Sequence, residues 1–141
     1  MNKEEIMALQ EYDLNKAIVE NIFGYKHYVG SEVPKEHYCM GAKGDQEIWL
    51  HEKGRYCKWC GDMPNYYNNI EDAWNIHLDM LGRYFSSRRK YYQALQDIAT
   101  NQSKLESGMM IMYPDVFTVL KNNMSESICR AALMVIFDCV E

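Results

Sequence analysis

The sequence predicts an α+β fold in which an N-terminal, a central and a C-terminal helix pack on a small antiparallel sheet. Two observations support this fold class. Apolar residues recur at helical spacing in those three places, and glycines and prolines divide the segment between the first two helices into short runs. Helices that bracket short strands pack as layers on a sheet. At 141 residues the chain has the size of one domain, so residues 1–141 are expected to form a single domain.

The first predicted helix covers residues 2–23, where polar residues separate the apolar positions Ile6, Leu9, Leu14, Ile18 and Ile22. Gly24 follows as a helix stop. Residues 25–64 are predicted to form short strands and turns, because runs such as "QEIWLH" and "GRYCKW" alternate with glycine.

The central helix is predicted over residues 69–85, with Asn68 or Asn69 as its N-cap. Its apolar stripe consists of Ile70, Ala73, Trp74, His77, Met80, Leu81 and Tyr84. A histidine on such a stripe is more often a hydrogen-bonded core residue than a metal ligand or a base. We therefore expect His77 to be structural.

The rest of the chain is predicted to contain further strands and the last helix. Polar and basic residues at 86–90 are expected to end the central helix, and residues 91–100 favour a strand over a continued helix. Apolar residues at 108–114 predict a strand that ends near the proline. Residues 125–136 predict a helix with a short Ser/Glu entry and a wide apolar face.

Three stretches of the sequence resemble the phage ABA-sandwich domain family. "LNKAIVENIFGYKHY" is similar to the family's N-terminal helix, which closes in a glycine followed by an aromatic residue. "PNYYNNIEDAW" is similar to its Pro-Tyr turn before an Ala-Trp helix, and "SESICRAAL" to its C-terminal helix. The resemblance implies a phage origin and an α/β/α sandwich. It implies no catalytic residues.

The bulk composition limits the classes of function. A net charge of -5 disfavours binding to duplex DNA, which requires lysine and arginine to neutralise phosphates. No apolar run approaches the roughly 18 residues of a membrane span, and the charged N-terminus lacks the apolar segment of a signal peptide. Together with the resemblance, this composition predicts a protein of the host cytoplasm with neither a membrane nor duplex DNA as partner.

The sequence "CKWCG", which contains Cys57 and Cys60, is the sharpest local feature. Two thiolates in a tight turn followed by glycine are typical of a zinc knuckle, and Cys39 and His37 are the nearest candidates for the other two ligands of a structural zinc. The alternative is that Cys57 and Cys60 are partly buried residues of a turn. A redox dithiol fits less well, because that chemistry needs a helix to begin at the cysteines.

The segment "GRYFSSRRKYY" interleaves basic and aromatic residues in an otherwise acidic protein. Guanidinium groups bind phosphates and aromatic rings stack on bases, so this composition suits a nucleotide or a short oligonucleotide. The predicted ligand-binding residues are Arg83, Tyr84, Arg88, Arg89, Tyr91 and Tyr92. The alternative is a solvated helix end with aromatic residues packed beneath it.

The sequence has no nucleophile elbow, phosphate-binding glycine loop or HExxH motif, so we do not expect an enzyme. We expect a homo-oligomeric phage accessory protein that acts by stoichiometric binding in the infected cell, in counter-defence or host takeover. It would sequester a nucleotide-type signal molecule or cap a host defence protein. The alternatives are a zinc-stabilised interaction protein without a small-molecule ligand, and a small nucleotide hydrolase or nuclease.

Overall fold

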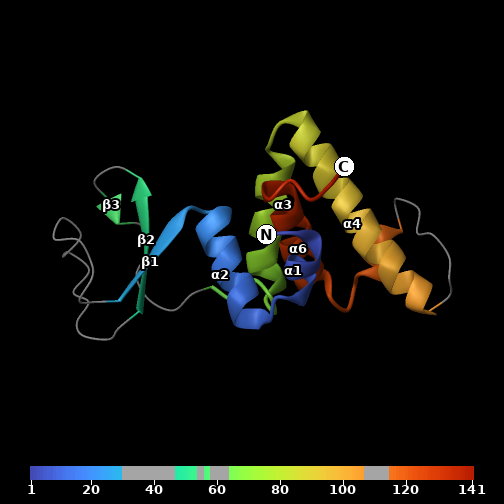
Figure 1. Ribbon diagram of the computed structural model, residues 1–141, viewed down its shortest axis with the longest axis horizontal. Coiled ribbons are helices and arrows are strands. Elements are labelled where there is room, and N and C mark those ends of the chain that lie inside the picture. The colour runs from blue at the N-terminus through green and yellow to red at the C-terminus, as the bar shows by residue number, and fades with distance from the viewer. Residues whose placement is uncertain (30–46, 54–55, 58–63, 107–114) are drawn as a thin grey trace.

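The computed structural model describes residues 1–29, 47–53, 56–57, 64–106 and 115–141, and most of these residues are helical (Figure 1). The elements are, in chain order, α1 (Lys3–Ala8), α2 (Glu11–Asn21), β1 (Tyr25–Val29), β2 (Glu47–Lys53), β3 (Tyr56–Cys57), α3 (Ile70–Leu81), α4 (Phe85–Glu106), α5 (Val116–Val119) and α6 (Met124–Ile136). None of the helices described here has the length and apolarity needed to cross a membrane.

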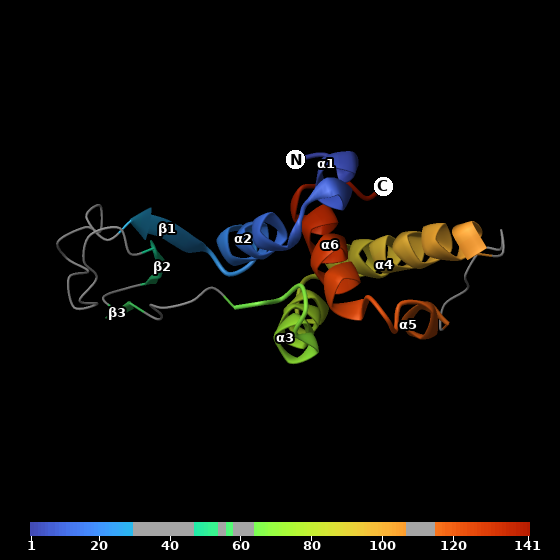
Figure 2. The same cartoon turned by 90° about the horizontal axis from the view of Figure 1, so that it is seen from below.

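The predicted α/β/α sandwich is wrong. The three strands pair antiparallel in the order β1-β2-β3, with Tyr25 opposite His51 and Glu52 opposite Cys57. They lie at one end of the molecule beyond α2, whereas α3, α4 and α6 lie on the other side of that helix (Figures 1 and 2). Helices therefore do not enclose the strands in layers. The apolar faces of the helices are buried against one another instead, which removes the need for a central sheet.

The hydrophobic core is formed by helices around α6, which contacts α1, α2, α3 and α4 (Figure 2). Every residue from 127 to 134 on α6 is buried, in agreement with the wide apolar face that predicted this helix. Fully buried side chains from the other helices complete the core, among them Ile6, Leu14, Ile18, Ile76, Met80 and Leu95. The prediction of a C-terminal helix is confirmed.

The single helix predicted over residues 2–23 is two helices. The chain turns to an extended conformation at Leu9, where ψ is 132°, and α2 begins after the next residue. The carbonyl oxygens of Ile6 and Leu9 accept hydrogen bonds from the buried Arg130 guanidinium of α6, so the end of α1 has partners for carbonyls that helices leave unpaired. Gly24 has φ 70° and closes α2 as predicted.

The central helix is confirmed as α3, with Asn69 as its N-cap and Gly82 as its C-cap, but it is shorter than predicted. Tyr84, predicted on its apolar stripe, lies beyond its end and is 89% exposed. The Oδ1 atom of Asn69 accepts a hydrogen bond of 3.0 Å from the backbone N–H of Glu71. Helix α2 holds the turn before this helix, because the buried Asn15 accepts a hydrogen bond of 3.0 Å from the backbone N–H of Tyr67. This hydrogen bond ties the turn to α2.

The break predicted at residues 86–90 and the strand predicted at 91–100 are both wrong, because α4 runs through both segments. Its buried positions follow the three- and four-residue spacing of a helix: Tyr91, Ala94, Leu95, Ile98 and Ala99. The basic residues before them are compatible with a helix because none of them is buried: Arg89 is exposed, and Arg88 and Lys90 are half-buried. The strand predicted at 108–114 lies outside the described residues.

Candidate ligand-binding site

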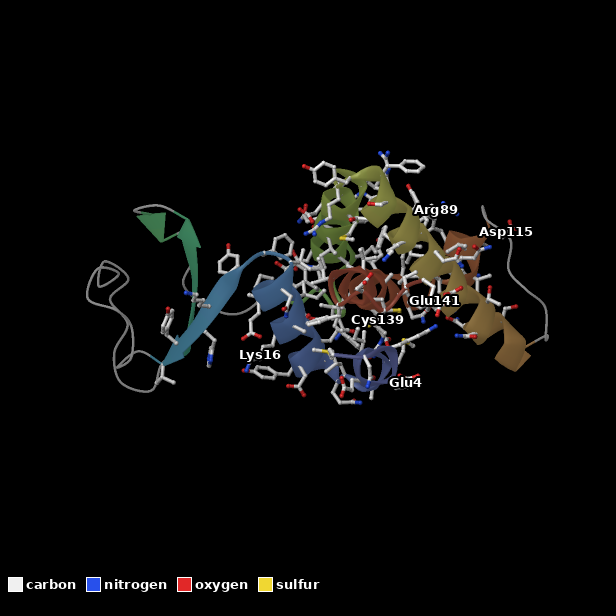
Figure 3. The ribbon with its side chains drawn as sticks, turned by 45° about the horizontal axis from the view of Figure 1, so that its top comes forward. Glu4, Lys16, Arg89, Asp115, Cys139 and Glu141 are labelled. Atoms are coloured by element: carbon white, nitrogen blue, oxygen red, sulfur yellow. The ribbon has the colours of Figure 1, made fainter. Side chains whose placement is uncertain are left out.

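A hollow of about 340 Å³ lies along the first half of α4. Its lining residues occupy one stripe of the helix and combine two guanidinium groups, two aromatic rings and two amides: Phe85, Arg88, Arg89, Tyr92, Gln93 and Gln96. Figure 3 shows Arg89 on α4, on the side of the molecule away from the strands. The hollow therefore belongs to the helical part of the protein.

The two arginines of the hollow are available to a ligand. The guanidinium carbon of Arg88 lies 5.7 Å from the centre of the Phe85 ring, a cation–π contact that limits where this side chain points. Arg89 is exposed. Neither arginine forms an ion pair with an acid in the described part of the chain. Both positive charges therefore lack a carboxylate to neutralise them there.

The neighbouring cations differ in this respect. The Nε atom of Arg83 lies 2.9 Å from a carboxylate oxygen of Asp79, and Lys90 forms an ion pair with Asp138. The hydrogen bond from Lys90 lowers the pKa of Asp138 below its usual value. Arg83 and Lys90 thus have partners already, which separates them from the two arginines of the hollow.

The structure places the six predicted ligand-binding residues in different environments. Arg88, Arg89 and Tyr92 line the hollow. Arg83 and Tyr84 come before the start of α4 and are not among the residues that line the hollow. Tyr91 is fully buried in the core, so it cannot reach a ligand in the hollow. The helix explains this division, because adjacent residues point about 100° apart around its axis.

The predicted ligand-binding residues do not include three residues of the hollow, namely Phe85 and the two amides Gln93 and Gln96. The side-chain Nε2 of Gln93 donates a hydrogen bond of 3.0 Å to Asp97, which orients its amide group. Both glutamines lie at helical spacing from Phe85, so a helix predicted through residues 86–96 would have grouped them with the arginines. The strand predicted for this segment hid that relationship.

His77 is a buried side chain with a hydrogen bond to the core, in agreement with the structural role predicted for it. Its Nδ1 lies 2.9 Å from the Tyr91 hydroxyl, and its ring stacks on Trp74 with the ring centres 4.5 Å apart. Phe117 meets it edge-on from α5. Burial lowers the pKa of His77 below its usual value, so the imidazole is neutral at pH 7. It packs α3 against α4 and lines no part of the hollow.

The predicted zinc ligands His37, Cys39 and Cys60 lie outside the described residues. Of Cys57 the structure describes only the backbone, which pairs with β2. The structural zinc therefore stays a prediction. In the described segments, no group of three or more histidine, cysteine, aspartate or glutamate side chains could hold a metal ion.

Cys129 of α6 is also not a candidate for chemistry. Its Sγ donates a hydrogen bond of 3.4 Å to the carbonyl oxygen of Tyr66, and the residue is fully buried. Burial raises the pKa of the Cys129 thiol far above its usual value. Because the thiolate is the reactive form, this side chain is an inert part of the core.

Comparison with protein-family models, with characterised proteins and with solved structures finds no match for the chain. The resemblance to the phage ABA-sandwich domain family therefore stays a prediction of origin, and the layered fold that it implies is not the fold observed. Function has to be argued from the hollow on α4 itself.

Proposed function

We propose that the protein acts by stoichiometric binding of a nucleotide-type anion in the hollow on α4. The observation that carries this proposal is the pair of arginines without acidic partners, Arg88 and Arg89, beside the rings of Phe85 and Tyr92. In the host cytoplasm of a phage-infected cell, such binding would sequester a signal molecule and serve counter-defence or host takeover.

The charges favour a phosphate at this place. The protein as a whole carries a net charge of -5, so an anion needs a local positive field to bind. Arg88 and Arg89 supply it, and a guanidinium group can donate two parallel hydrogen bonds to one phosphate. Because Phe85 already restrains Arg88, less side-chain freedom is lost when a ligand binds.

The aromatic rings favour a base. Phe85 is 71% exposed, and Tyr92 is partly buried on the same stripe of α4. Stacking on an aromatic side chain contributes about 1–3 kcal/mol per base. A hollow of about 340 Å³ is at the small end of ligand pockets, which suits one nucleotide better than an extended strand.

The chemistry of the lining favours binding without turnover. Among the described residues that line the hollow there is no carboxylate, imidazole, thiol or serine hydroxyl, so these residues offer neither a general base of the usual kinds nor an activated nucleophile. This supports sequestration over the alternative of a nucleotide hydrolase or nuclease.

The capping of a host defence protein has less support. That version predicts an exposed patch rich in tyrosine and methionine. The large exposed side chains of these two types come from separate elements of the described structure, namely the N-terminus, α1, α2 and the turn before α4: Met1, Met7, Tyr12 and Tyr84. The hollow on α4 is the better-defined site.

Isothermal titration calorimetry with mono-, di- and cyclic nucleotides tests this proposal. We expect one nucleotide class to bind, and the double substitution Arg88→Ala with Arg89→Ala to abolish the heat. Arg83→Ala is the matched control, because it removes a guanidinium that is paired with Asp79 outside the hollow. Absence of heat from every nucleotide, or equal loss in the control, contradicts the proposal.

A further inference from the structure

Helix α3 presents an exposed apolar stripe to solvent. Ile70 is 45% exposed, Trp74 43% and Leu78 54%, and their spacing of four residues places them on one side of the helix. The core face of α3 is a different set of residues: Ala73, Ile76, His77 and Met80. Ile70 and Trp74, which the sequence assigns to the core stripe, are therefore at the surface.

This stripe differs from scattered surface hydrophobic residues. Trp74 is held in place by stacking on the buried His77, so one large ring stands at a fixed position on the helix. Aromatic residues at fixed positions are the usual anchors of protein interfaces, and adjacent exposed apolar side chains mark interaction sites. We propose that α3 is a homodimer interface, in which the stripe packs antiparallel on the same stripe of a second copy.

The arrangement of the stripe fits a second copy because it is symmetric. An aliphatic residue stands four positions before Trp74 and another four positions after it. When two such helices meet antiparallel about a two-fold axis through Trp74, Ile70 of one copy lies against Leu78 of the other. The same pair forms again on the opposite side of the axis, as an isologous contact requires.

The charges around α3 favour the same orientation. Glu71 and Asp72 lie in the first turn of the helix, whereas at its other end Asp79 is paired with Arg83. Antiparallel packing sets the acidic start of one helix against this neutral pair of the other, whereas parallel packing would bring the two acidic starts together. It also sets the two helix dipoles in opposite directions.

The size of the stripe predicts a weak dimer. Trp74 leaves on the order of 100 Å² of its side chain in water, and the two aliphatic residues add comparable areas. A stable interface buries about 800 Å² on each partner, so the stripe supplies only its centre. We expect a dimer that forms in the micromolar range and dissociates on dilution. This inference does not depend on the proposed function, because α3 does not line the hollow.

Sedimentation velocity over a range of protein concentrations tests the interface. We expect monomer at about 1 μM and dimer at a few hundred micromolar, with Leu78→Glu weakening the dimer at least tenfold. Tyr12→Glu is the matched control, because Tyr12 is 49% exposed on α2, and it should leave the dimer unchanged. Circular dichroism shows whether each variant is folded. A monomer at all concentrations, or a dimer that survives Leu78→Glu, overturns the inference.

Mixed disulfides test the antiparallel orientation. Two copies of residue 70 would lie about 12 Å apart along the direction of the helix axes, too far for a disulfide, whereas residues 70 and 78 of different copies would be adjacent. One chain carrying Ile70→Cys and another carrying Leu78→Cys are mixed and oxidised. The disulfide-linked dimer of the two different chains should therefore form in a larger amount than any disulfide-linked dimer of the wild-type chain. Disulfides between identical chains alone, or no increase over the wild-type chain, overturn the proposal.

Discussion

The Nδ1 atom of His77 lies 2.9 Å from the hydroxyl of Tyr91, and this buried contact joins α3 to α4. Tyr91 points into the core, and Tyr92, the next residue along α4, lines the hollow. The contact therefore fixes the helix on which the candidate ligand-binding residues stand. Sites built on a helix that is anchored in the core hold their side chains more precisely than sites on loops.

The Tyr91 hydroxyl is expected to stabilise the fold without serving the ligand. Tyr91→Phe leaves the buried Nδ1 of His77 without its partner, which should lower the free energy of unfolding by about 1–3 kcal/mol. Affinity for a nucleotide should not change. Urea denaturation measures the free energy of unfolding, and calorimetry measures the affinity for the nucleotide. Tyr92→Phe is the control, and it should lower the free energy of unfolding less than Tyr91→Phe does. A Tyr91→Phe variant as stable as the wild type would contradict the role of this contact.

Stability is expected to fall at mildly acidic pH because of His77. Burial lowers the pKa of His77 below its usual value of 6.5, so the unfolded chain takes up a proton at a higher pH than the folded protein. The free energy of unfolding should be constant with respect to this group above pH 6.5 and should decrease as pH falls below it, by at most about 1.4 kcal/mol per pH unit. Urea denaturation from about pH 7.5 to about pH 5.5, a range on both sides of the usual histidine pKa of about 6.5, measures how the free energy of unfolding changes with pH. The variant His77→Gln serves as the comparison. An equal slope in both proteins would assign it to other groups.

Arg130 is expected to be the most sensitive charged residue of the core. Its side chain is buried and donates hydrogen bonds to the carbonyl oxygens of Ile6 and Leu9 and to the carboxylate of Glu126. Arg130→Ala removes the guanidinium group from that carboxylate and from both carbonyls, which should cost about 3–5 kcal/mol. Arg130→Lys should retain only part of this stability, because an ammonium group cannot reproduce the several hydrogen bonds that the planar guanidinium group donates.

Limited proteolysis distinguishes this local role from a general loss of stability. If Arg130 attaches α1 to α6, cleavage near Leu9 should become faster in Arg130→Lys under conditions where the rest of the chain is protected. Unchanged cleavage there, together with wild-type stability of Arg130→Lys, would show that a positive charge alone is sufficient.

The zinc hypothesis predicts one metal ion per chain. Elemental analysis of protein purified without a histidine tag should find zinc, and Cys57→Ser or Cys60→Ser should remove it, because a tetrahedral site needs all four of its ligands. Cys139→Ser is the control, since this residue lies near the C-terminus and bonds the carbonyl oxygen of Met1. Protein without zinc would leave the cysteines as residues of a turn.

Local sequence patterns predicted the helices whose signals are local. Helix α3 has an N-cap at Asn69. Helix α6 has an apolar face so wide that the sequence alone indicates a helix buried in the core. The break between α1 and α2 could not be predicted in this way. The carbonyl oxygens at this break are bonded by Arg130, which reaches Leu9 from 121 positions along the chain. Helix α4 was missed because the basic residues at its start were interpreted as a stop, although a helix tolerates long charged side chains that are exposed or half-buried.

The same limit applies to the surface sites. Composition alone pointed to Arg88, Arg89 and Tyr92, but only the helix shows that Tyr91 faces the core. On α3 the apolar residues surround more than half of the helix, so the sequence could not show which of them meet the core. That choice is made by the packing of α4 and α6, and it leaves Trp74 at the surface.

Nuclear magnetic resonance tests most directly whether a nucleotide binds in the hollow on α4. A ¹⁵N-labelled sample titrated with the nucleotide that gives heat in calorimetry should show its largest shifts in the side-chain amides of Gln93 and Gln96 and in the backbone of residues 85–96. These shifts should disappear in the double variant Arg88→Ala with Arg89→Ala and persist in Arg83→Ala. Shifts centred on another element, with α4 unaffected, would contradict the proposed site.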